Sequence, residues 1–488
     1  MIFLQILFHC LWPCITIASE ASYRKSAKEF SGYSLIQTVP NTKENVELLR
    51  SLHTNINPDG MDFWSFPTTV GKSVLLLVKP ELYEATQNVF YQQNMTFDVI
   101  LRNVSEMIKE ERKKVNLEKE RFDSSEEAKS AQRQGQYPFN FFNYNPLKEI
   151  NEYLTHVSQN TANYNPLPGL NVSQHSIGTT YEGRSINMIT ITLNDGNGKK
   201  KAGIWMDCGI HAREWISPAF CMYSIDQLIR VSIYLLRRYD FYIVPVLNPD
   251  GYAHTWIPSD NVRCEDGMCR LWRKNRKPVD VSRLNSKVRS QMQLDWKKQF
   301  QKALKNFPEI SFNPEIDDKI QVVSAPQRSG RKTLGSFPRR VASDSTSLLN
   351  LRSTCQGVDL NRNFEMYWNT TGSSDNPCDS IFHGPTPFSE KESNAIREAI
   401  NSIKSTQKIA SYVTVHSFSQ LWFYPYSIIP GVSPHRVDLD RVARKSVLAL
   451  SSLYETQYEY GKATDVIYEH GGNSVDWAHG KVIILKNK

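Results

Sequence analysis

Four apolar runs, separated by stretches of helical periodicity, constrain the fold of this chain more than any other feature. The runs are Ile186–Leu193, Ala202–Gly209, Asp240–Leu247 and Ala410–His416. Near-continuous apolar strands that alternate with helices are typical of a sheet covered by helices on both faces. One of these helices is expected to begin at Ser217, with Pro218 in its first turn. The sequence therefore predicts an α/β domain from about residue 140 onward.

A smaller α+β unit is expected before this domain. The segment from Asn41 to His53 has helical spacing, with Asn41 as its cap and Glu44 three residues later. The run Ser73–Val78 has the composition of a buried strand. From Phe97 the pattern becomes helical and highly charged, which indicates a solvated connector. Since exposed polar connectors are where proteolysis concentrates, a trypsin-like cut near Arg133 is expected.

The first residues have the pattern of a secretory signal peptide, assigned to residues 1–19. An apolar run from Ile2 to Ile17 is followed by the small residues Ala18, Ser19 and Ala21. No Lys or Arg precedes the run, and a membrane anchor is the alternative, although the run is short for a bilayer. No later stretch predicts a membrane span, so the chain is expected to be secreted and extracellular. Four N-glycosylation sequons agree with this route, at Asn94, Asn103, Asn171 and Asn369.

Secretion changes how the eight cysteines are interpreted, because Cys10 and Cys14 would leave with the signal peptide. Six cysteines in an oxidising compartment favour three disulfides. Proximity along the chain suggests the pairs Cys208–Cys221, Cys264–Cys269 and Cys355–Cys378, which is one of the fifteen pairings that six cysteines allow.

The positive charge of the chain is concentrated in one segment. Between Arg276 and Arg340 there are 15 Lys and Arg against 6 Asp and Glu, whereas the whole chain carries +8. The rest of the chain is therefore near neutral, and no nucleic-acid partner is expected; a binder of nucleic acid or heparin stays an alternative that rests on this segment alone. One amphipathic helix is predicted within it, from apolar residues at every fourth position: Val288, Met292, Trp296, Phe300 and Leu304.

Three side chains that can bind a metal follow the carboxyl ends of two predicted strands. His211 and Glu214 come just after one strand, and His416 ends another. Ligand sites in open α/β sheets gather at these strand ends. Two imidazoles and a carboxylate, with a fourth position open, are the ligands of catalytic zinc. A histidine taken alone is more often structural, so the spacing of His211 and Glu214 by itself decides little.

Several longer blocks make the chain resemble the zinc metallocarboxypeptidases of the carboxypeptidase A/B type. They are "HAREWIS", "LNPDGY", "RLWRKNR", "GVDLNRNF", "VTVHSFSQ" and "IYEHGGNSVDW", in the order of that family. The resemblance extends roughly from Phe139 to Trp477. It implies a mixed, mostly parallel sheet of the eight-stranded type with helices on both faces. The preceding α+β unit resembles the activation segment of the family, so the resemblance implies a secreted procarboxypeptidase, expected to be monomeric.

The resemblance assigns a role to each candidate residue of the metal centre. His211, Glu214 and His416 would hold one Zn²⁺ per chain, which would lower the pKa of its bound water to about 7. Arg273 would stabilise the oxyanion that forms when water attacks. Asp359 would orient His211 through a hydrogen bond. Without the family blocks, Arg273 would be interpreted as a solvated charge and Asp359 as a loop carboxylate.

The resemblance also predicts how the C-terminal end of a peptide substrate would be recognised. Asn361 and Arg362 would bind the terminal carboxylate, for which the fork of a guanidinium is well suited. Tyr468 would close over the bound residue, although a core tyrosine is the alternative, and Arg213 would make an additional substrate contact. Val475 lies where the family sets side-chain preference. An apolar residue there favours aromatic and aliphatic side chains, unless Val475 only contributes to packing.

Two features depart from the family pattern. Residues 276–354 form a basic insertion between Arg273 and Asn361. After "DWAHG" the family continues with a strand that carries a general-base glutamate and then a helix, whereas here no Asp or Glu follows Asp476. Loss of a general base typically costs about 10²–10⁴-fold in rate. The catalytic domain is therefore expected to be truncated and its activity impaired. The resemblance also supports the pairs Cys208–Cys221 and Cys355–Cys378, while Cys264–Cys269 stays a guess.

These observations together predict three parts of the chain after the signal peptide: an activation segment at 26–133, a metallocarboxypeptidase domain at 134–488, and the basic insertion at 276–354 within it. The expected function is that of a zinc-dependent exopeptidase zymogen that removes C-terminal aromatic or aliphatic residues. The alternative is an inactive zinc- or peptide-binding relative, or a truncated product.

Overall fold

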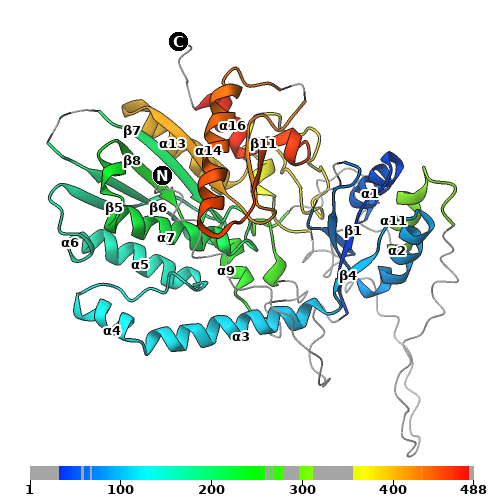
Figure 1. Ribbon diagram of the computed structural model, residues 1–488, viewed down its shortest axis with the longest axis horizontal. Coiled ribbons are helices and arrows are strands. Elements are labelled where there is room, and N and C mark those ends of the chain that lie inside the picture. Colours follow the sequence, from blue (N-terminus) through cyan, green and yellow to red (C-terminus); the bar gives the residue numbers. More distant parts are fainter. Residues whose placement is uncertain are drawn as a thin grey trace, which may run out of the picture. The chain divides into compact units, whose positions relative to one another are not determined.

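The chain forms two compact units in the computed structural model (Figure 1). The structure describes residues 32–482 except 57–59, 66, 68, 197, 199, 259–260, 262–263, 265–268, 280–295, 312–354 and 430. The large unit contains residues 106–279 and 356–488, and the small unit contains residues 30–105 and 280–355. The predicted signal peptide and the segment 483–488 lie outside the described residues. Within the described part, no helix is long and apolar enough to cross a bilayer.

The small unit is built on an antiparallel sheet with the strand order β2-β3-β1-β4. The strands are β1 (Ser34–Thr38), β2 (Met61–Phe63), β3 (Val74–Val78) and β4 (Asp98–Leu101). The helices are α1 (Lys43–Asn55), α2 (Pro80–Gln92) and α11 (Trp296–Leu304). Strand β3 matches the run predicted at Ser73–Val78. Helix α11 comes from the basic insertion, so a segment distant in sequence is part of this unit.

The predicted cap of the first helix is wrong by one residue. Thr42, not Asn41, is the cap: its hydroxyl accepts from the backbone N–H of Asn45 at 3.1 Å. The Asn45 side chain accepts in return from the Thr42 N–H at 3.2 Å. This reciprocal pair satisfies two N–H groups that a helix start leaves without partners, so Asn45 takes the place that the sequence suggested for Glu44.

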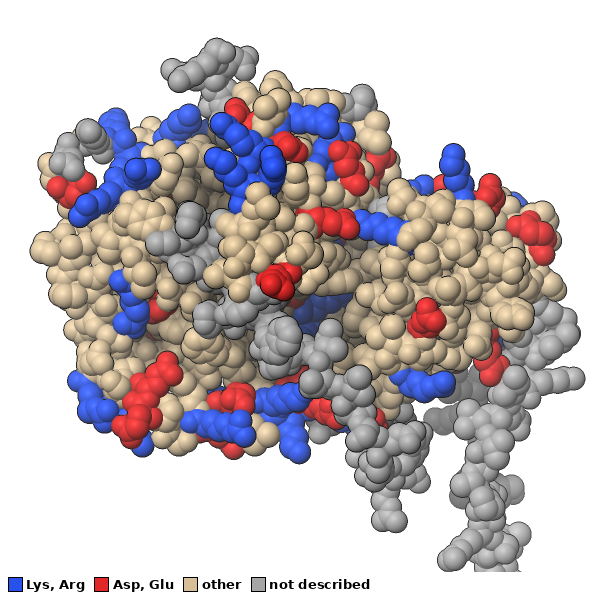
Figure 2. Space-filling model, in the orientation of Figure 1, with Lys and Arg blue, Asp and Glu red and all other residues tan. Residues whose placement is uncertain are grey.

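The charged connector forms two helices, α3 (Val104–Asp123) and α4 (Glu126–Arg133). Most of their charged side chains are exposed, and Figure 2 shows both signs interspersed on this face of the molecule. From Glu106 onward α3 nevertheless belongs to the large unit: Ile108 and Val115 are buried, and the Val115 carbonyl accepts from the Asn143 side chain at 2.8 Å. The connector is therefore not solvated on all sides, because α3 has a buried apolar side.

The large unit contains a mixed five-stranded sheet with the order β5-β6-β8-β7-β9. The strands are β5 (Leu170–Thr179), β6 (Ser185–Leu193), β7 (Ala202–Cys208), β8 (Tyr239–Val244) and β9 (Ile409–Val415). The pairs β7–β8 and β7–β9 are parallel, and β5–β6 and β6–β8 are antiparallel. The mixed sheet agrees with the prediction. The described strands of this sheet number five, and β10 (Leu421–Tyr424) and β11 (Glu459–Lys462) pair with each other in a separate parallel ribbon.

Helices cover both faces of this sheet, as the apolar runs predict (Figure 1). One core layer joins Tyr153 and Leu228 on helices to Met206 and Phe241 on strands. The other layer joins Ile396 and Trp477 to Trp205 and Tyr412. The helical segments are α5 (Leu147–Gln159), α6 (Thr161–Tyr164), α7 (Ile216–Arg230), α8 (Ile233–Leu236), α9 (Pro249–Thr255), η2 (Cys269–Leu271), η4 (Leu360–Arg362), α13 (Lys391–Thr406), α14 (Arg436–Tyr454), α15 (Ala463–Val466) and α16 (Ser474–Lys481).

Candidate metal centre and peptide-binding site

The candidate metal ligands meet because their strands are parallel neighbours. His211 and Glu214 lie in the turn between β7 and α7, and His416 directly follows β9. The register pairs Cys208 with Val415, so both strands end at the same edge of the sheet. Gly209 allows the chain to leave β7 sharply: it has φ +63°, and a side chain there would come within 3.0 Å of Pro218.

The ligand atoms of the three residues face one another. The Nδ1 atoms of His211 and His416 are 3.1 Å apart. One carboxylate oxygen of Glu214 lies 2.8 Å from the His211 Nδ1, and the other lies 3.1 Å from the His416 Nδ1. His211 and Glu214 are buried and His416 is partly buried. Within the described residues, this is the one group of three or more His, Cys, Asp or Glu residues that could hold a metal ion.

The outer nitrogen of His211 faces a carboxylate. Its Nε2 is 3.1 Å from an oxygen of Asp359, which is fully buried. A histidine that binds metal through Nδ1 carries its proton on Nε2, and a carboxylate partner fixes this tautomer and the ring orientation. The arrangement therefore fits zinc in its donor set and in the support behind His211.

Asp359 also holds Arg273 next to the three ligands. The Nε and Nη2 atoms of Arg273 donate to one oxygen of Asp359 at 3.2 and 2.9 Å. Its Nη1 lies 3.8 Å from the Glu214 carboxylate. The guanidinium is thus fixed beside the metal-binding group, where a developing negative charge could be stabilised without further reorganisation.

Burial and close charges set the protonation states of these groups. Burial alone would raise the pKa of Glu214, but the adjacent imidazoles hold that pKa well below its ordinary value. Burial likewise opposes ionisation of Asp359, yet Arg273 and His211 keep its pKa well below the usual range. Burial and the charge of Arg273 lower the pKa of His211. A neutral imidazole beside two carboxylates is the state that binds a cation.

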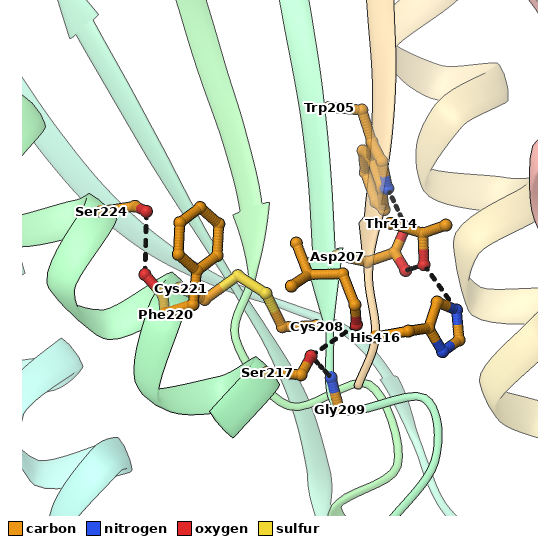
Figure 3. The surroundings of a disulfide bond; sticks show 11 residues. Trp205, Asp207, Cys208, Gly209, Ser217, Phe220, Cys221, Ser224, Thr414 and His416 are labelled. Atoms are coloured by element: carbon orange, nitrogen blue, oxygen red, sulfur yellow. Dashed lines mark hydrogen bonds between the residues drawn. A yellow bond between two sulfur atoms is a disulfide. The ribbon is translucent and has the colours of Figure 1, made fainter. Parts of the chain in front are cut away.

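A network behind the ligands fixes the ends of β7 and β9 (Figure 3). Thr414 donates from its hydroxyl to Asp207 at 2.7 Å, and the same hydroxyl lies 3.5 Å from the His416 Nε2. On the other side of β7, Ser217 accepts from the Gly209 N–H at 2.9 Å and donates to the Val415 carbonyl at 2.6 Å. Ser217 was predicted to cap α7. It lies inside that helix instead, because its hydroxyl ties the two strand ends together.

The candidate substrate-binding residues form a second cluster. Arg362 is buried, and its Nη2 donates to the Tyr468 hydroxyl at 2.8 Å. Asn361 accepts from the Ser474 N–H at 3.0 Å, and its amide nitrogen lies 3.5 Å from the His416 Nε2. The structure thus brings Asn361 next to His416, a candidate metal ligand, and Arg362 next to Tyr468.

Helix α16 is held against this cluster by close backbone contacts. Gly472 has φ +71°, and a side chain there would meet the Arg362 carbonyl at 2.2 Å. The Gly472 carbonyl accepts from the Phe364 N–H at 2.9 Å. Val475, the candidate specificity residue, is half-buried in the first turn of α16. It follows Ser474, whose N–H contacts Asn361, so it lies within one residue of the cluster.

No role was assigned to Arg270 from the sequence, although this residue contacts the turn that carries the candidate ligands His211 and Glu214. Its guanidinium lies 3.8 Å from the ring centroid of Trp215, the residue after Glu214, and its Nη1 donates to the Arg213 carbonyl at 2.9 Å. Arg213 itself is half-buried in the same turn. Glu111 of α3 accepts from Arg270 at 2.7 and 3.0 Å. Two of the three arginines in the block "RLWRKNR", Arg270 and Arg273, have different contacts that the sequence alone does not distinguish.

The described cysteines are all disulfide-bonded. The structure contains Cys208–Cys221, which joins β7 to α7 beside the metal-binding turn, and Cys264–Cys269 (Figure 3 shows the first). Cys355 and Cys378 are also disulfide-bonded. The first bridge fixes the strand end from which His211 and Glu214 extend.

This fold and site define the class of the protein: the chain belongs to the zinc carboxypeptidase family. The family model described as "Zinc carboxypeptidase" matches residues 167–485, and the model described as "Carboxypeptidase activation peptide" matches residues 36–111. The chain is thus a member of a family of metallocarboxypeptidases, which hydrolyse peptide bonds, and it contains an activation-peptide segment. The resemblance expected from the sequence is confirmed.

Individual relatives agree with this assignment. The chain is 28% identical to human carboxypeptidase B over 480 residues, which covers 96% of this chain and 87% of the relative. It is 29% identical to mast cell carboxypeptidase A of Rattus norvegicus over 452 residues, 90% of this chain and 81% of the relative. The crystal structure of carboxypeptidase A from Helicoverpa armigera shares the fold, with a TM-score of 0.66 and 22% identity, and covers 94% of this chain and 90% of that one.

Proposed function

We propose that this chain is the zymogen of a secreted, monomeric, zinc-dependent exopeptidase that removes aromatic or aliphatic residues from the C-terminal ends of peptides. The observation that carries this proposal is the convergence of His211, Glu214 and His416 within hydrogen-bonding distance of one another. A bound zinc would polarise the scissile carbonyl and activate a water molecule.

The residues around the ligands support the hydrolytic step. Asp359 keeps His211 in the tautomer that leaves Nδ1 free for the metal. The same carboxylate holds Arg273 in place, so that its guanidinium can stabilise negative charge on the substrate oxygen. Arg273 and Glu214 thus provide a positive and a negative group that lie 3.8 Å apart at the proposed reaction centre.

Recognition of a free carboxylate would make the enzyme an exopeptidase. Arg362 is the proposed partner, with Asn361 beside it and Tyr468 donating from its hydroxyl to the bound peptide. In the structure the Arg362 guanidinium already lies against that hydroxyl, so a substrate carboxylate would enter between groups that are close together. A fork of N–H donors matches a carboxylate in two parallel hydrogen bonds.

The proposed preference for apolar side chains rests on Val475. Its side chain is half-buried, and it carries no charge that could neutralise a substrate Lys or Arg. Arg213, in the metal-binding turn, is proposed to contact the incoming peptide on the other side.

Activation is proposed to follow a cut near Arg133 by a trypsin-like protease. Arg133 is the last residue of α4 and its side chain is 66% exposed. Gln134 and Gly135 after it are exposed as well. A basic residue at an exposed helix end is accessible to such a protease.

The buried carboxylate of Asp476, next to Val475, is proposed to have a structural rather than a catalytic role. The Asp476 carboxylate accepts from the Ser427 N–H at 3.1 and 2.9 Å and from Asn473 at 3.1 Å. It is fully buried, and burial raises its pKa to about 6. A carboxylate with these contacts fixes the start of α16 and is not free to accept a proton from a substrate water.

The test is hydrolysis of a peptide that ends in Phe by this polypeptide after a cut near Arg133, with and without a zinc chelator. The proposal expects chelator-sensitive release of Phe and none from the same peptide with an amidated end. Release of internal fragments would contradict an exopeptidase. Stoichiometric zinc and peptide binding without any hydrolysis would favour the alternative, an inactive relative.

A further inference from the structure

The basic insertion contributes a helix to the core of the small unit. Helix α11 lies beside α1 in Figure 1, although about 250 residues separate them in the sequence. Phe300, Ala303 and Leu304 of α11 are buried in the same apolar cluster as Leu48 and Leu52 of α1. The spacing of the three buried residues is that of one helix face, so the contact is a continuous stripe.

Polar contacts fix the register of this packing. The Ser51 hydroxyl on α1 donates to the Ala303 carbonyl at 2.6 Å, which gives a partner to a carbonyl near the C-terminal end of α11. The side-chain amide of Gln92, at the end of α2, binds both backbone groups of Ser311. Its nitrogen donates to the carbonyl at 3.0 Å, and its oxygen accepts from the N–H at 2.8 Å.

Apolar residues extend the contact beyond the helix. Ile310 is buried in the same cluster, with Phe307 packed against it from the partly exposed side. The segment 296–311 therefore touches the small unit through a helix face, a following turn and two sets of hydrogen bonds. Its departure would expose Phe300, Leu304 and Ile310 to water together, which is unfavourable.

We propose that segment 296–311 is a docking element that keeps the activation peptide bound to the catalytic chain after the connector is cut. This inference rests on the proposed function, since it assumes that residues 36–111 act as an activation peptide that is separated near Arg133. Hydrolysis there breaks one peptide bond and leaves α1 and α2 without a covalent link to the catalytic chain. Helix α11 stays part of that chain, on the C-terminal side of the cut, and remains packed on α1.

The test uses the full chain with an affinity tag on the catalytic part and a site for a sequence-specific protease inserted after Gln134. The inserted site ensures a complete cut whether or not a trypsin-like protease acts naturally at Arg133, and the readout does not depend on catalysis. After the cut, the N-terminal fragment is expected to be captured with the tagged part under native conditions. Elution of that fragment alone, with the cut complete on a denaturing gel, would overturn the proposal.

Variants separate this contact from any other that retains the fragment. Phe300→Ala is expected to raise the dissociation constant of the fragment by about 100-fold or more, because a large buried side chain is lost. The control Gln301→Ala changes an exposed neighbour on the same helix and is expected to have no effect. Equal retention with Phe300→Ala and Gln301→Ala would show that α11 is not the docking element.

If Phe300→Ala fails to fold, amide hydrogen exchange of the unsubstituted protein before and after the cut still tests the proposal. The amides of residues 300–304 are expected to exchange slowly before the cut and to remain slow after it, because α11 stays packed. A large increase in their exchange rate on cutting alone would contradict retention of the contact.

Discussion

Glu111 on the connecting helix and Arg270 beside the metal-binding turn form a two-point ion pair, with contacts of 2.7 and 3.0 Å. Arg112, the next residue on α3, adds a hydrogen bond to the Ile257 carbonyl at 2.7 Å. These contacts join the part of the chain that precedes the expected cut to the turn that carries Glu214. We therefore expect a protease to reach the connector more easily when α3 is detached from these contacts.

Replacing Glu111 with Gln is expected to loosen α3, because it removes a paired charge while Arg270 stays partly buried. The rate of trypsin cleavage in the connector should rise by about 5- to 30-fold, which corresponds to a loss of roughly 1–2 kcal/mol in local stability. The matched control is Glu118→Gln on the same helix, where the pair with Arg121 is exposed and contributes little. Equal cleavage of both variants would show that the Glu111 contact does not hold the connector.

The secondary structure of the large unit could be predicted from the sequence because its strands are apolar and bounded by clear turns. Strand β7 begins at the predicted residue, and β9 begins within one residue of it. The helix starts were less certain. Asn41 and Thr42 are both good caps, and the choice between them depends on the side chain of Asn45.

The candidate site could be predicted only in part. Residues from different family blocks do lie together in the structure: His211 is beside His416, and Arg362 is beside Tyr468. The role of Arg270 depends on Glu111, a partner 159 residues away. The position of α11 depends on the core of the small unit, whose other helices and strands come from the start of the chain. Neither follows from periodicity, because an amphipathic helix has one apolar face but no indication of which surface covers it.

Arg362→Lys is expected to weaken binding of a peptide that ends in Phe by about 10- to 100-fold, because an ammonium cannot form two parallel hydrogen bonds with a carboxylate. Calorimetric titration of the cut protein measures this loss without requiring turnover. Tyr468→Phe, which removes only the hydroxyl that Arg362 contacts, should have a smaller effect. Unchanged affinity in Arg362→Lys would remove this arginine from the proposed carboxylate site.

Val475→Asp is expected to reverse the preference between peptides that end in Phe and in Arg. A half-buried carboxylate would pair with a cationic side chain and would be desolvated by an apolar one. The ratio of the two dissociation constants should change by about 100-fold, whereas Val475→Ile should leave Phe preferred. If Val475→Asp binds both peptides as the unsubstituted protein does, Val475 contributes only to packing.

The stability of the large unit is expected to depend on pH through His254. This residue is buried, and burial together with Arg276 and Arg184 lowers its pKa to about 3. A histidine whose folded pKa lies below its unfolded value contributes stability above pH 6.5 that is lost as the pH falls toward 3. Between pH 6.5 and 4.5 this loss amounts to roughly 2–3 kcal/mol.

Thermal unfolding of His254→Gln and of the unsubstituted protein over this pH range measures the contribution. The variant is expected to start with a lower Tm at pH 7 and to lose less stability on acidification. Parallel curves for the two proteins would mean that His254 does not titrate differently in the folded and unfolded states.

The zinc content of the purified, folded zymogen tests the account most directly. One zinc per chain is expected, and His211→Ala should lower that content to near zero while circular dichroism shows that the fold is kept. The control His175→Ala, at an exposed position on β5, should retain one zinc. If His211→Ala binds as much zinc as the unsubstituted chain, or if the folded chain binds none, the proposed metal centre is contradicted.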